Sequence, residues 1–284
     1  MSLLSMENVS YRYPINDWTS LKQVTLNIEA GVFYAVIGAN GAGKTTLCSV
    51  LRGFIPHFYN GELEGEVKLF GKNLLEYELG DIASRIGYLF QNPFTQISGA
   101  KETVFEEIAY GLENLGMEPA EIRKKVEDVI ALLKLEKIAE SNPTELSGGQ
   151  KQRVAFAAVI VMDPEVLIID EPTSQLDPQG TEEIFRIIDL MKQRGKTIIL
   201  VEHKMEWIAE YADQIIVMED GQVVMQGDTQ SILSNPKVME HGGSLPQYAE
   251  VGLKLLGEEL VNQVPITRKQ AELVFSKLKK GGAE

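Results

Sequence analysis

The hydrophobic positions along this chain predict two kinds of β-strand. Three early segments, residues 5–13, 23–31 and 64–71, alternate apolar and polar residues, as strands with one buried face do. Five later segments are continuously apolar, which is typical of strands covered on both faces: 32–38, 85–90, 166–170, 197–202 and 214–219. Helical patterns separate most of these five. The order predicts an α/β fold built on a parallel sheet.

The pattern between Gln91 and Asp163 is helical instead. Two apolar helix faces are predicted there, one formed by Val104, Phe105, Ile108, Leu112 and Leu115 and the other by Ile122, Val126, Val129, Ile130 and Leu133. A helical insertion over about 92–163 therefore interrupts the α/β core. After Pro236, two more helices are predicted over about 246–261 and 267–280, as a small C-terminal appendage.

The composition limits the class of protein. The chain has 284 residues, 44% of them apolar, and a formal net charge of −14. It can bury a large core, and it lacks the clustered Lys and Arg that a nucleic-acid partner requires. The single Cys48 cannot form an intramolecular disulfide. No segment approaches the roughly 20 apolar residues that span a bilayer, and the first residues lack a targeting pattern. We expect a cytoplasmic location and, for any membrane role, a protein partner.

A glycine-rich loop follows the first continuous apolar run. Residues 38–46 read GANGAGKTT and precede a helical pattern, the context in which backbone N–H groups and a helix N-terminus bind phosphates. Lys44 is expected to contact the β and γ phosphates, and the Thr45 hydroxyl to bind Mg²⁺. A turn without a ligand is the plain alternative.

Polar residues follow three of the buried strands. Asp170 ends the run 166–170 and Glu171 follows it. Asp170 is expected to hold Mg²⁺ through its water shell and Glu171 to polarise an attacking water. Gln91 and His203 also lie just beyond strand ends, at the edge where open parallel sheets bind ligands. Gln91 can meet a metal and a water, and His203 can donate to a γ-phosphate. Each could instead cap a helix or fill a loop.

A second glycine turn, LSGGQ at 146–150, precedes another predicted helix. Ser147 and Gln150 have the spacing of a capping box. That reading leaves Gly148 and Gly149 unexplained, since glycine disfavours a helix by up to about 1 kcal/mol at interior positions. The two glycines expose first-turn N–H groups and, with Ser147, make a second anion site. It could serve its own chain's nucleotide or that of another chain.

These motifs, in this order and spacing, resemble those of ABC transporter ATPases over about residues 3–235. The resemblance implies a P-loop NTPase core with an antiparallel β subdomain and a helical signature subdomain, as one nucleotide-binding domain over 1–235. It also implies a head-to-tail homo- or heterodimer, in which two ATP molecules lie between the phosphate loop of one protomer and LSGGQ of the other. The appendage, 236–284, is a candidate dimerisation element.

The same resemblance implies the site residues. ATP is bound by Tyr13, Gly38, Asn40, Gly41, Ala42, Gly43, Lys44, Thr45, Thr46, Ser147, Gly148, Gly149, Gln150 and Asp177. Mg²⁺ is bound by Thr45, Gln91 and Asp170, and catalysis involves Glu171, His203, Gln91 and Lys44. Tyr13 would stack on adenine, with Tyr11 as the less favoured candidate, although both could be ordinary strand residues. Asp177 would link the two sites, and Gln175 departs from the usual SALD or AGLD loop.

A narrower resemblance concerns the ATPases of energy-coupling factor (ECF) transporters, which import vitamins or transition-metal ions. The segments 51–67 and 90–117 and the C-terminal tail are similar to theirs, including a Gln-Asn-Pro sequence and the second Gln96. Phe94 and Thr95 replace the usual acidic residues. The alternatives are another ABC importer ATPase, a non-transport ABC protein, or an ATP-dependent switch without turnover.

ECF membership implies a transmembrane coupling subunit and a substrate-binding membrane subunit as partners. It places the chain at the cytoplasmic face of the membrane as a peripheral protein. The segment 92–116 links Gln91 to the helical insertion, and we expect its exposed face, including Glu107, Ser98 and Gly99, to be the docking surface. The segment could also simply pack on its own domain.

Overall fold

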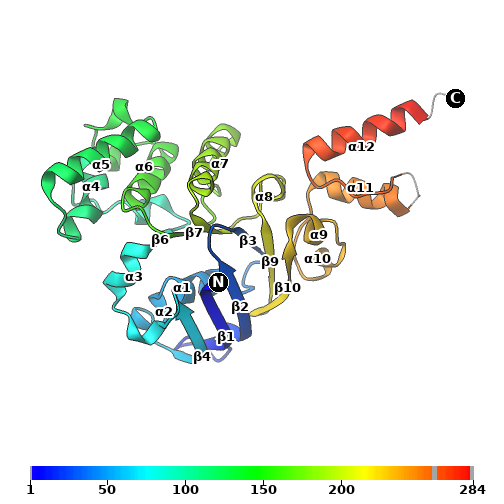
Figure 1. Ribbon diagram of the computed structural model, residues 1–284, viewed down its shortest axis with the longest axis horizontal. Coiled ribbons are helices and arrows are strands. Elements are labelled where there is room, and N and C mark those ends of the chain that lie inside the picture. The colour runs from blue at the N-terminus through cyan, green and yellow to red at the C-terminus, as the bar shows by residue number, and fades with distance from the viewer. Residues whose placement is uncertain (1, 258–260, 282–284) are drawn as a thin grey trace.

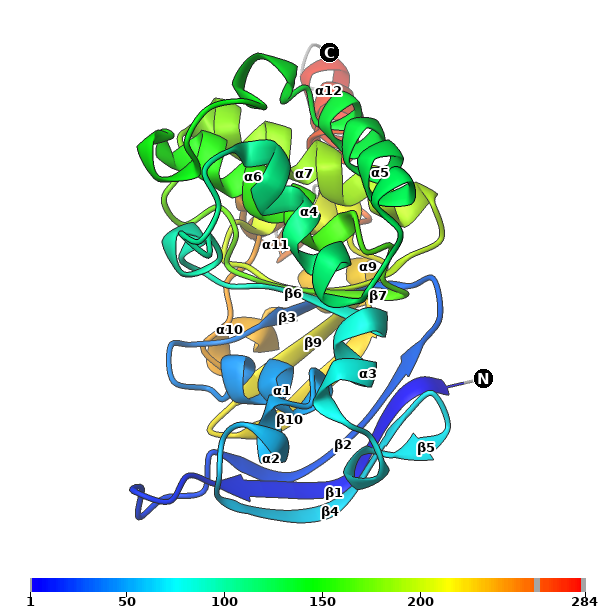
Figure 2. The same ribbon diagram turned by 90° about the vertical axis from the view of Figure 1, so that its left-hand side faces the viewer.

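The computed structural model describes residues 2–257 and 261–281 as two sheets flanked by helices (Figure 1). The larger sheet has the strand order β10-β9-β3-β8-β7-β6, and the smaller, antiparallel sheet has the order β2-β1-β4-β5. Figure 2 shows the larger sheet between two layers of helices, with the smaller sheet outside one of them. The predicted α/β class is confirmed.

All five continuous apolar runs form strands of the larger sheet. These are β3 (Phe33–Ile37), β6 (Ile86–Leu89), β7 (Val166–Asp170), β8 (Thr197–Val201) and β9 (Gln214–Glu219). Every residue of β3, β6, β7 and β8 is buried, as expected for strands between two helical layers. The five strands pair in parallel. Their carboxyl ends therefore meet at one edge of the sheet.

The larger sheet also has one antiparallel edge strand, which the apolar runs did not predict. There β10 (Gln222–Asp228) pairs antiparallel with β9. The two-residue turn between them has φ of 48° at Asp220 and 82° at Gly221. Two successive positive φ values match the twist of a tight hairpin, for which Asp-Gly is a preferred sequence.

The smaller sheet contains β1 (Ser2–Arg12), β2 (Leu21–Glu29), β4 (Glu62–Leu69) and β5 (Lys72–Asn73). The elements α1 (Lys44–Leu51), α2 (Phe54–His57), η1 (Leu74–Glu76) and α3 (Leu79–Arg85) follow β3 and β5 in the chain. One apolar core joins this sheet and α1 to the larger sheet, with Leu26, Leu47 and Ile168 among its buried members. The core fixes the orientation of α1, which carries Lys44.

A second core covers the opposite face of the larger sheet. It packs Phe33, Leu167 and Leu200 against helices α4 (Val104–Asn114), α5 (Pro119–Leu132), α6 (Gly148–Ile160) and α7 (Pro178–Gln193). The short helix η2 (Pro93–Thr95) lies between β6 and α4, and η3 (Glu136–Ile138) and η4 (Pro143–Glu145) connect α5 to α6. The helical pattern predicted between residues 91 and 163 is thus observed.

Two expectations about this region are wrong. Leu115 does not share the buried face of α4, because it follows the last helical residue and is 48% exposed. Glu107, expected on the exposed face, is only 4% exposed. Its carboxylate accepts hydrogen bonds from the Ser98 N–H at 2.7 Å and the Ser98 hydroxyl at 2.8 Å. Glu107 therefore holds the segment before α4 in place instead of facing a partner.

The remaining helices are α8 (Met205–Tyr211), α9 (Thr229–Leu233), α10 (Lys237–Glu240), α11 (Gln247–Gly257) and α12 (Arg268–Gly281). A third core packs buried residues of α8, α9, α10 and α11 against Ile37 and Val217 of the larger sheet. The helix predicted over 246–261 is observed as α11, and residues 258–260 of that prediction lie outside the described residues. Among the described helices, none combines the length and apolarity needed to cross a bilayer.

Candidate functional site

The loop between β3 and α1 has a backbone that only glycine can supply at two positions. Gly38 has φ of 143°, and a Cβ there would lie 2.1 Å from the carbonyl oxygen of Met218. Gly43 has φ of 99°, and a Cβ there would lie 2.8 Å from the Ser20 carbonyl oxygen. Any side chain at either position would be strained and would collide with main chain. The two glycines let the loop fold back over the N-terminus of α1.

Lys44 is the first residue of α1 and is 5% exposed. Its Nζ donates to the carbonyl oxygens of Gly38 and Ala39, each at 2.9 Å. Burial lowers the pKa of the ammonium group, and the nearby Glu171 and Asp170 carboxylates oppose that shift. An ammonium group has three N–H donors. Two of the Lys44 N–H donors are therefore directed at loop carbonyls, which holds the ammonium group against the backbone of the loop.

Asp170, the last residue of β7, is 6% exposed. One of its oxygens, Oδ2, accepts hydrogen bonds from the Thr45 hydroxyl at 3.0 Å and the Tyr88 hydroxyl at 3.3 Å. Burial raises the pKa of Asp170, Glu171 adds to the increase, and the bond from Thr45 opposes it. The sequence patterns did not single out Tyr88, which lies in β6 one strand away. Its hydroxyl group did not stand out in the sequence, because Tyr88 lies within the apolar run 85–90.

Glu171 lies at the centre of the site. Its Oε2 accepts a hydrogen bond from Gln91 Nε2 at 2.7 Å, and its Oε1 lies 3.0 Å from His203 Nε2. Its φ of 44° is unusual for a residue with a side chain, and its N–H donates to the Val201 carbonyl at 2.9 Å. Such strained conformations persist where surrounding contacts enforce them. Gln91 and His203, which were predicted at the ends of two other strands, therefore meet at the Glu171 carboxylate.

A buried carboxylate that the sequence patterns missed supports His203. Glu202 is 3% exposed and accepts hydrogen bonds from the Thr173 hydroxyl at 2.7 Å and the His203 backbone N–H at 2.9 Å. It thereby ties the residue after β8 to the loop after β7. The available signal was an acidic residue at the end of an otherwise apolar run, since buried carboxylates are rare unless hydrogen-bonded.

A cavity of about 430 Å³ opens beside the phosphate loop and Glu171, and neither Asp170 nor His203 lines it. Six residues of the phosphate loop (38–46) line it, together with Gln91 and Glu171. Two further stretches that the sequence did not indicate, 18–20 and 220–221, complete the lining. Trp18 is 65% exposed there. The Asp-Gly hairpin turn was recognisable, but only the fold places it beside the loop.

Tyr13 and Tyr11 differ in exposure. Tyr11 is fully buried and donates its hydroxyl to the Asn60 carbonyl at 2.8 Å. Tyr13 is partly exposed, packs edge-on against Tyr11 at 4.7 Å, and has its hydroxyl 3.4 Å from Thr46 Oγ1. Neither ring lines the cavity. Of the two, Tyr13 is the one with ring surface available beside the phosphate loop.

The second glycine turn stays apart from this cavity. Ser147 and Gln150 form the predicted capping box at the start of α6, with the Gln150 side chain accepting from the Ser147 N–H at 2.9 Å. A Cβ at Gly148 or Gly149 would meet nothing within 4 Å. None of residues 146–150 lines the cavity. Within the described chain, packing therefore does not explain why both residues are glycine.

Comparison with known proteins identifies the family. A family model described as ABC transporter matches residues 21–174. An ABC transporter ATP-binding protein of Pyrococcus abyssi is 43% identical over 90% of this chain and 91% of its own length. One of Pyrococcus horikoshii is 40% identical over 94% of each chain. The chain belongs to the ABC transporter family. It is an ATP-hydrolysing subunit of that family.

Solved structures agree with this ABC ATPase fold. CbiO1 of Clostridium perfringens, described as part of the ABC transporter complex CbiONQ, is 30% identical, with a TM-score of 0.73 over 91% of this chain and 98% of its own. A dimeric ATP-binding cassette in a post-hydrolysis state with ADP and Pi is 26% identical, with a TM-score of 0.69 over 80% of this chain and 98% of its own. The predicted P-loop ABC fold is thereby confirmed.

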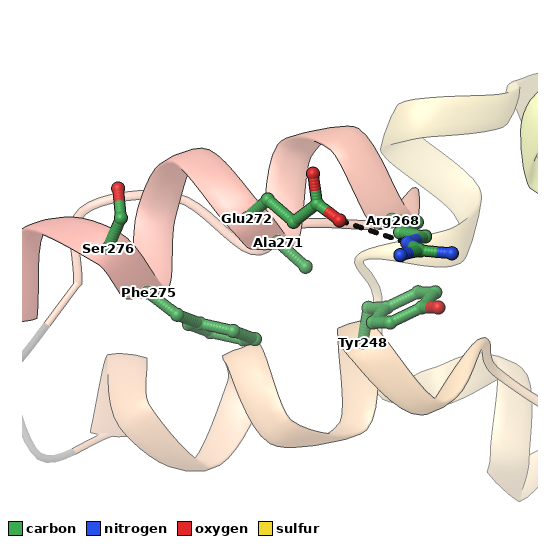
Figure 3. A pocket seen from close by; sticks show the side chains of 6 residues that line it. All are labelled: Tyr248, Arg268, Ala271, Glu272, Phe275 and Ser276. Carbon is green, nitrogen blue, oxygen red and sulfur yellow. Dashed lines mark hydrogen bonds and ion pairs between the residues drawn. The ribbon is translucent and has the colours of Figure 1, made fainter.

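A second cavity of this ABC ATPase, of about 390 Å³, lies far from these motifs between α11 and α12 (Figure 3). Tyr248 of α11 faces Ala271 and Phe275 of α12 across it. Arg268 and Glu272 form an ion pair at 2.9 Å on α12. None of the residues predicted for the nucleotide site lines this second cavity.

The burial of Asp170 gives a prediction about stability. Because burial raises its pKa, the ionised form is disfavoured in the folded protein, and this cost is present above the raised pKa. Asp170→Asn keeps an oxygen that can accept the two hydrogen bonds. The variant should unfold at a higher temperature than wild type at pH 8, and the gain should shrink as the pH falls through the raised pKa towards the ordinary value of 3.8. Thermal unfolding checks this, with the exposed Asp128→Asn as control; an equal or lower midpoint at pH 8 contradicts it.

Proposed function

We propose that the chain is the ATPase subunit of an ECF-type ABC importer for vitamins or transition-metal ions. The similarity to CbiO1 over nearly the whole of both chains supports this assignment, since that protein is described as part of the CbiONQ complex. The Gln-Asn-Pro segment and the C-terminal helices of this chain are further features shared with ECF ATPases. An importer of another class is the alternative.

The observation that carries the mechanism is the position of Glu171 between Gln91 and His203. Glu171 is the group placed to polarise an attacking water as general base. Gln91 turns its amide nitrogen to Glu171, which leaves its oxygen to face a metal or water. His203 is oriented by its backbone bond to Glu202 and is placed to donate to a γ-phosphate oxygen. Lys44 supplies positive charge at the phosphates.

The residues present fit Mg²⁺, which prefers oxygen ligands and keeps several waters. The Thr45 hydroxyl and the Asp170 carboxylate lie 3.0 Å apart and offer such oxygens, with the Gln91 amide nearby. The described residues contain no group of three or more His, Cys, Asp or Glu that could hold a metal, so ATP and water would complete the shell. Bound there, Mg²⁺ would neutralise charge on the phosphates.

We assign the remaining loop residues to phosphate binding through their backbone N–H groups and the N-terminus of α1. These are Gly38, Asn40, Gly41, Ala42, Gly43 and Thr46. Tyr13 is the proposed adenine contact, because its ring surface is available beside Thr46 whereas Tyr11 is buried.

The ATP-bound form is proposed to be a dimer that shares its two sites. The open space around Gly148 and Gly149 supports this, because a phosphate from another protomer can approach backbone that no side chain covers. Ser147 and Gln150 would contribute from the same turn. Asp177 caps α7 by accepting from the Gly180 N–H at 2.7 Å, and would link the sites. The solved dimeric cassette is a family precedent.

We further propose residues 1–235 as the nucleotide-binding domain, with the helical subdomain at about 92–163, and residues 236–284 as an appendage that contributes to dimerisation. A transmembrane coupling subunit and a substrate-binding membrane subunit would place the chain at the cytoplasmic membrane face. Since Glu107 is buried, the docking surface is assigned to the apolar residues Phe94, Tyr110 and Leu115, which are 54%, 36% and 48% exposed.

The first test concerns hydrolysis. Glu171→Gln should retain ATP binding but lower kcat by about 10²–10⁴-fold, the range for positioned acid–base groups. Phosphate release and equilibrium nucleotide binding measure the two effects. Glu182→Gln, which removes an exposed carboxylate paired only with Arg186 on α7, is the matched control. Near-normal turnover of the Glu171 variant would exclude Glu171 as the base.

The second test concerns the shared sites. Lys44→Ala and Ser147→Arg each disable both sites of their own homodimer. In a mixed dimer, both defects fall in one site and the other site is intact if sites are shared. Mixing the variants should therefore restore ATPase activity, up to roughly a quarter of wild type for random pairing of equal amounts. Absence of recovery, with mixed dimers demonstrated by mass spectrometry, would mean that each chain serves its own nucleotide.

The third test concerns the membrane partner. The chain should copurify from its native membrane with a coupling subunit and a substrate-binding subunit. Phe94→Asp or Leu115→Asp should abolish that association and solute uptake while leaving nucleotide binding unchanged. Val251→Asp, at a position 47% exposed on α11, is the control for adding a charge to an exposed apolar position. Normal copurification of both docking variants would place the surface elsewhere.

A further inference from the structure

The short helix α10 ends in a corner that is packed against the phosphate loop. The corner is a Schellman motif, in which the Gly242 N–H donates to the Met239 carbonyl at 3.2 Å and the Gly243 N–H to the Val238 carbonyl at 3.0 Å. Gly242 occupies the left-handed position, with φ of 71°. The motif alone explains why a glycine follows the helix.

Contact with the loop adds a second constraint on Gly242. A Cβ there would lie 3.0 Å from Ala39 Cβ and 3.7 Å from the Ala39 nitrogen. The backbone of residue 242 thus lies against Ala39 of the phosphate loop, although about two hundred positions separate the two residues in sequence. Figure 2 shows α10 beside the connection from β3 to α1.

The corner is anchored to a turn that touches the same loop. His241 Nδ1 lies 2.8 Å from Glu219 Oε2, at the end of β9. Two residues further on, the Gly221 N–H donates to the Ala42 carbonyl at 3.0 Å. The phosphate loop is therefore contacted at Ala39 by the corner and at Ala42 by the turn, and the His241–Glu219 pair joins the two supports.

We propose that Gly242 is a positioning residue for ATP binding, acting through Ala39. The Ala39 carbonyl is one of the two that hold the Lys44 ammonium group. A side chain at position 242 would push Ala39 and so displace an acceptor that sets the position of Lys44. The effect would fall on nucleotide affinity, although residue 242 does not line the cavity.

The alternative is that Gly242 only caps α10. Gly116 allows the two roles to be separated, because it follows α4 in the same motif. Its N–H donates to the Glu113 carbonyl at 2.9 Å, and its φ is 70°. A Cβ at Gly116 would meet nothing within 4 Å. Alanine at 116 and alanine at 242 therefore impose a similar backbone strain, but only the second presses on the loop.

The experiment is a double-mutant cycle in the full chain. Gly242→Ala should raise KM for ATP and Kd for a non-hydrolysed ATP analogue by about tenfold, the change expected where about 1.4 kcal/mol of the overpacking cost falls on the nucleotide-bound loop. The kcat should change little, because binding energy that is lost equally from the ground state and the transition state raises KM alone. Gly116→Ala should leave KM unchanged. Adding Ala39→Gly removes the methyl group that the new Cβ meets, and should bring both constants back towards those of Ala39→Gly alone.

The readouts separate positioning from general loss of structure. A purely structural role would lower the active fraction, and hence the apparent kcat, without raising KM. If Gly242→Ala is too unstable to assay, Gly242→Asn retains a Cβ on a residue that tolerates the left-handed region, and the same rescue by Ala39→Gly is expected. The proposal is overturned if the Gly242 variant binds the analogue as Gly116→Ala does, or if Ala39→Gly gives no rescue.

Discussion

The candidate site depends on the convergence of buried strand ends at one edge of the larger sheet. Because β3, β6, β7 and β8 are covered on both faces and run parallel, their carboxyl ends present successive residues along a single line. Asp170 is the last residue of β7, and Gln91 and His203 each lie two residues past the ends of β6 and β8. Lys44 follows the fourth through the glycine loop. No one segment could position these groups, since each comes from a different strand.

That convergence places charged groups in a largely buried site, where the charge of each group affects the pKa of the others. Burial raises the pKa of Asp170 and lowers that of Lys44, so each group is less favourable in its ionised form than it would be in water. Their attraction offsets part of that cost. Glu171 in addition has a strained backbone, with φ of 44° in the left-handed region. Conformational strain and buried charge at one edge are features that a sequence selected only for stability would avoid, and they are accepted at sites of function.

Sequence patterns predicted the structure correctly where the local environment allows only one class of residue. Continuous apolar runs predicted all five parallel strands, because a strand covered on both faces has no polar position. The phosphate loop was recognisable because its glycines have no substitute. The sequence could not identify the partners of Glu202 and Tyr88, since Thr173 and Asp170 are distant in sequence and meet them only in the folded sheet. Hydrophobic periodicity could not show that Glu107 is buried, because it registers side-chain type and not the hydrogen bonds that make a buried carboxylate tolerable.

The contacts around the loop also connect the site to both ends of the molecule. On one side, Gln91 leads through the segment that Glu107 holds to α4 and the helical layer. On the other, Ala39 rests on the corner that leads from α10 to α11, and α11 shares an apolar core with Ile37 of β3. Packed interiors transmit displacement because they leave little free space. A movement of the phosphate loop on binding ATP would therefore reach the C-terminal helices through Ala39, just as a movement of Gln91 would reach the proposed docking surface. A single bound nucleotide would thus act on the helical layer through Gln91 and on the C-terminal helices through Ala39.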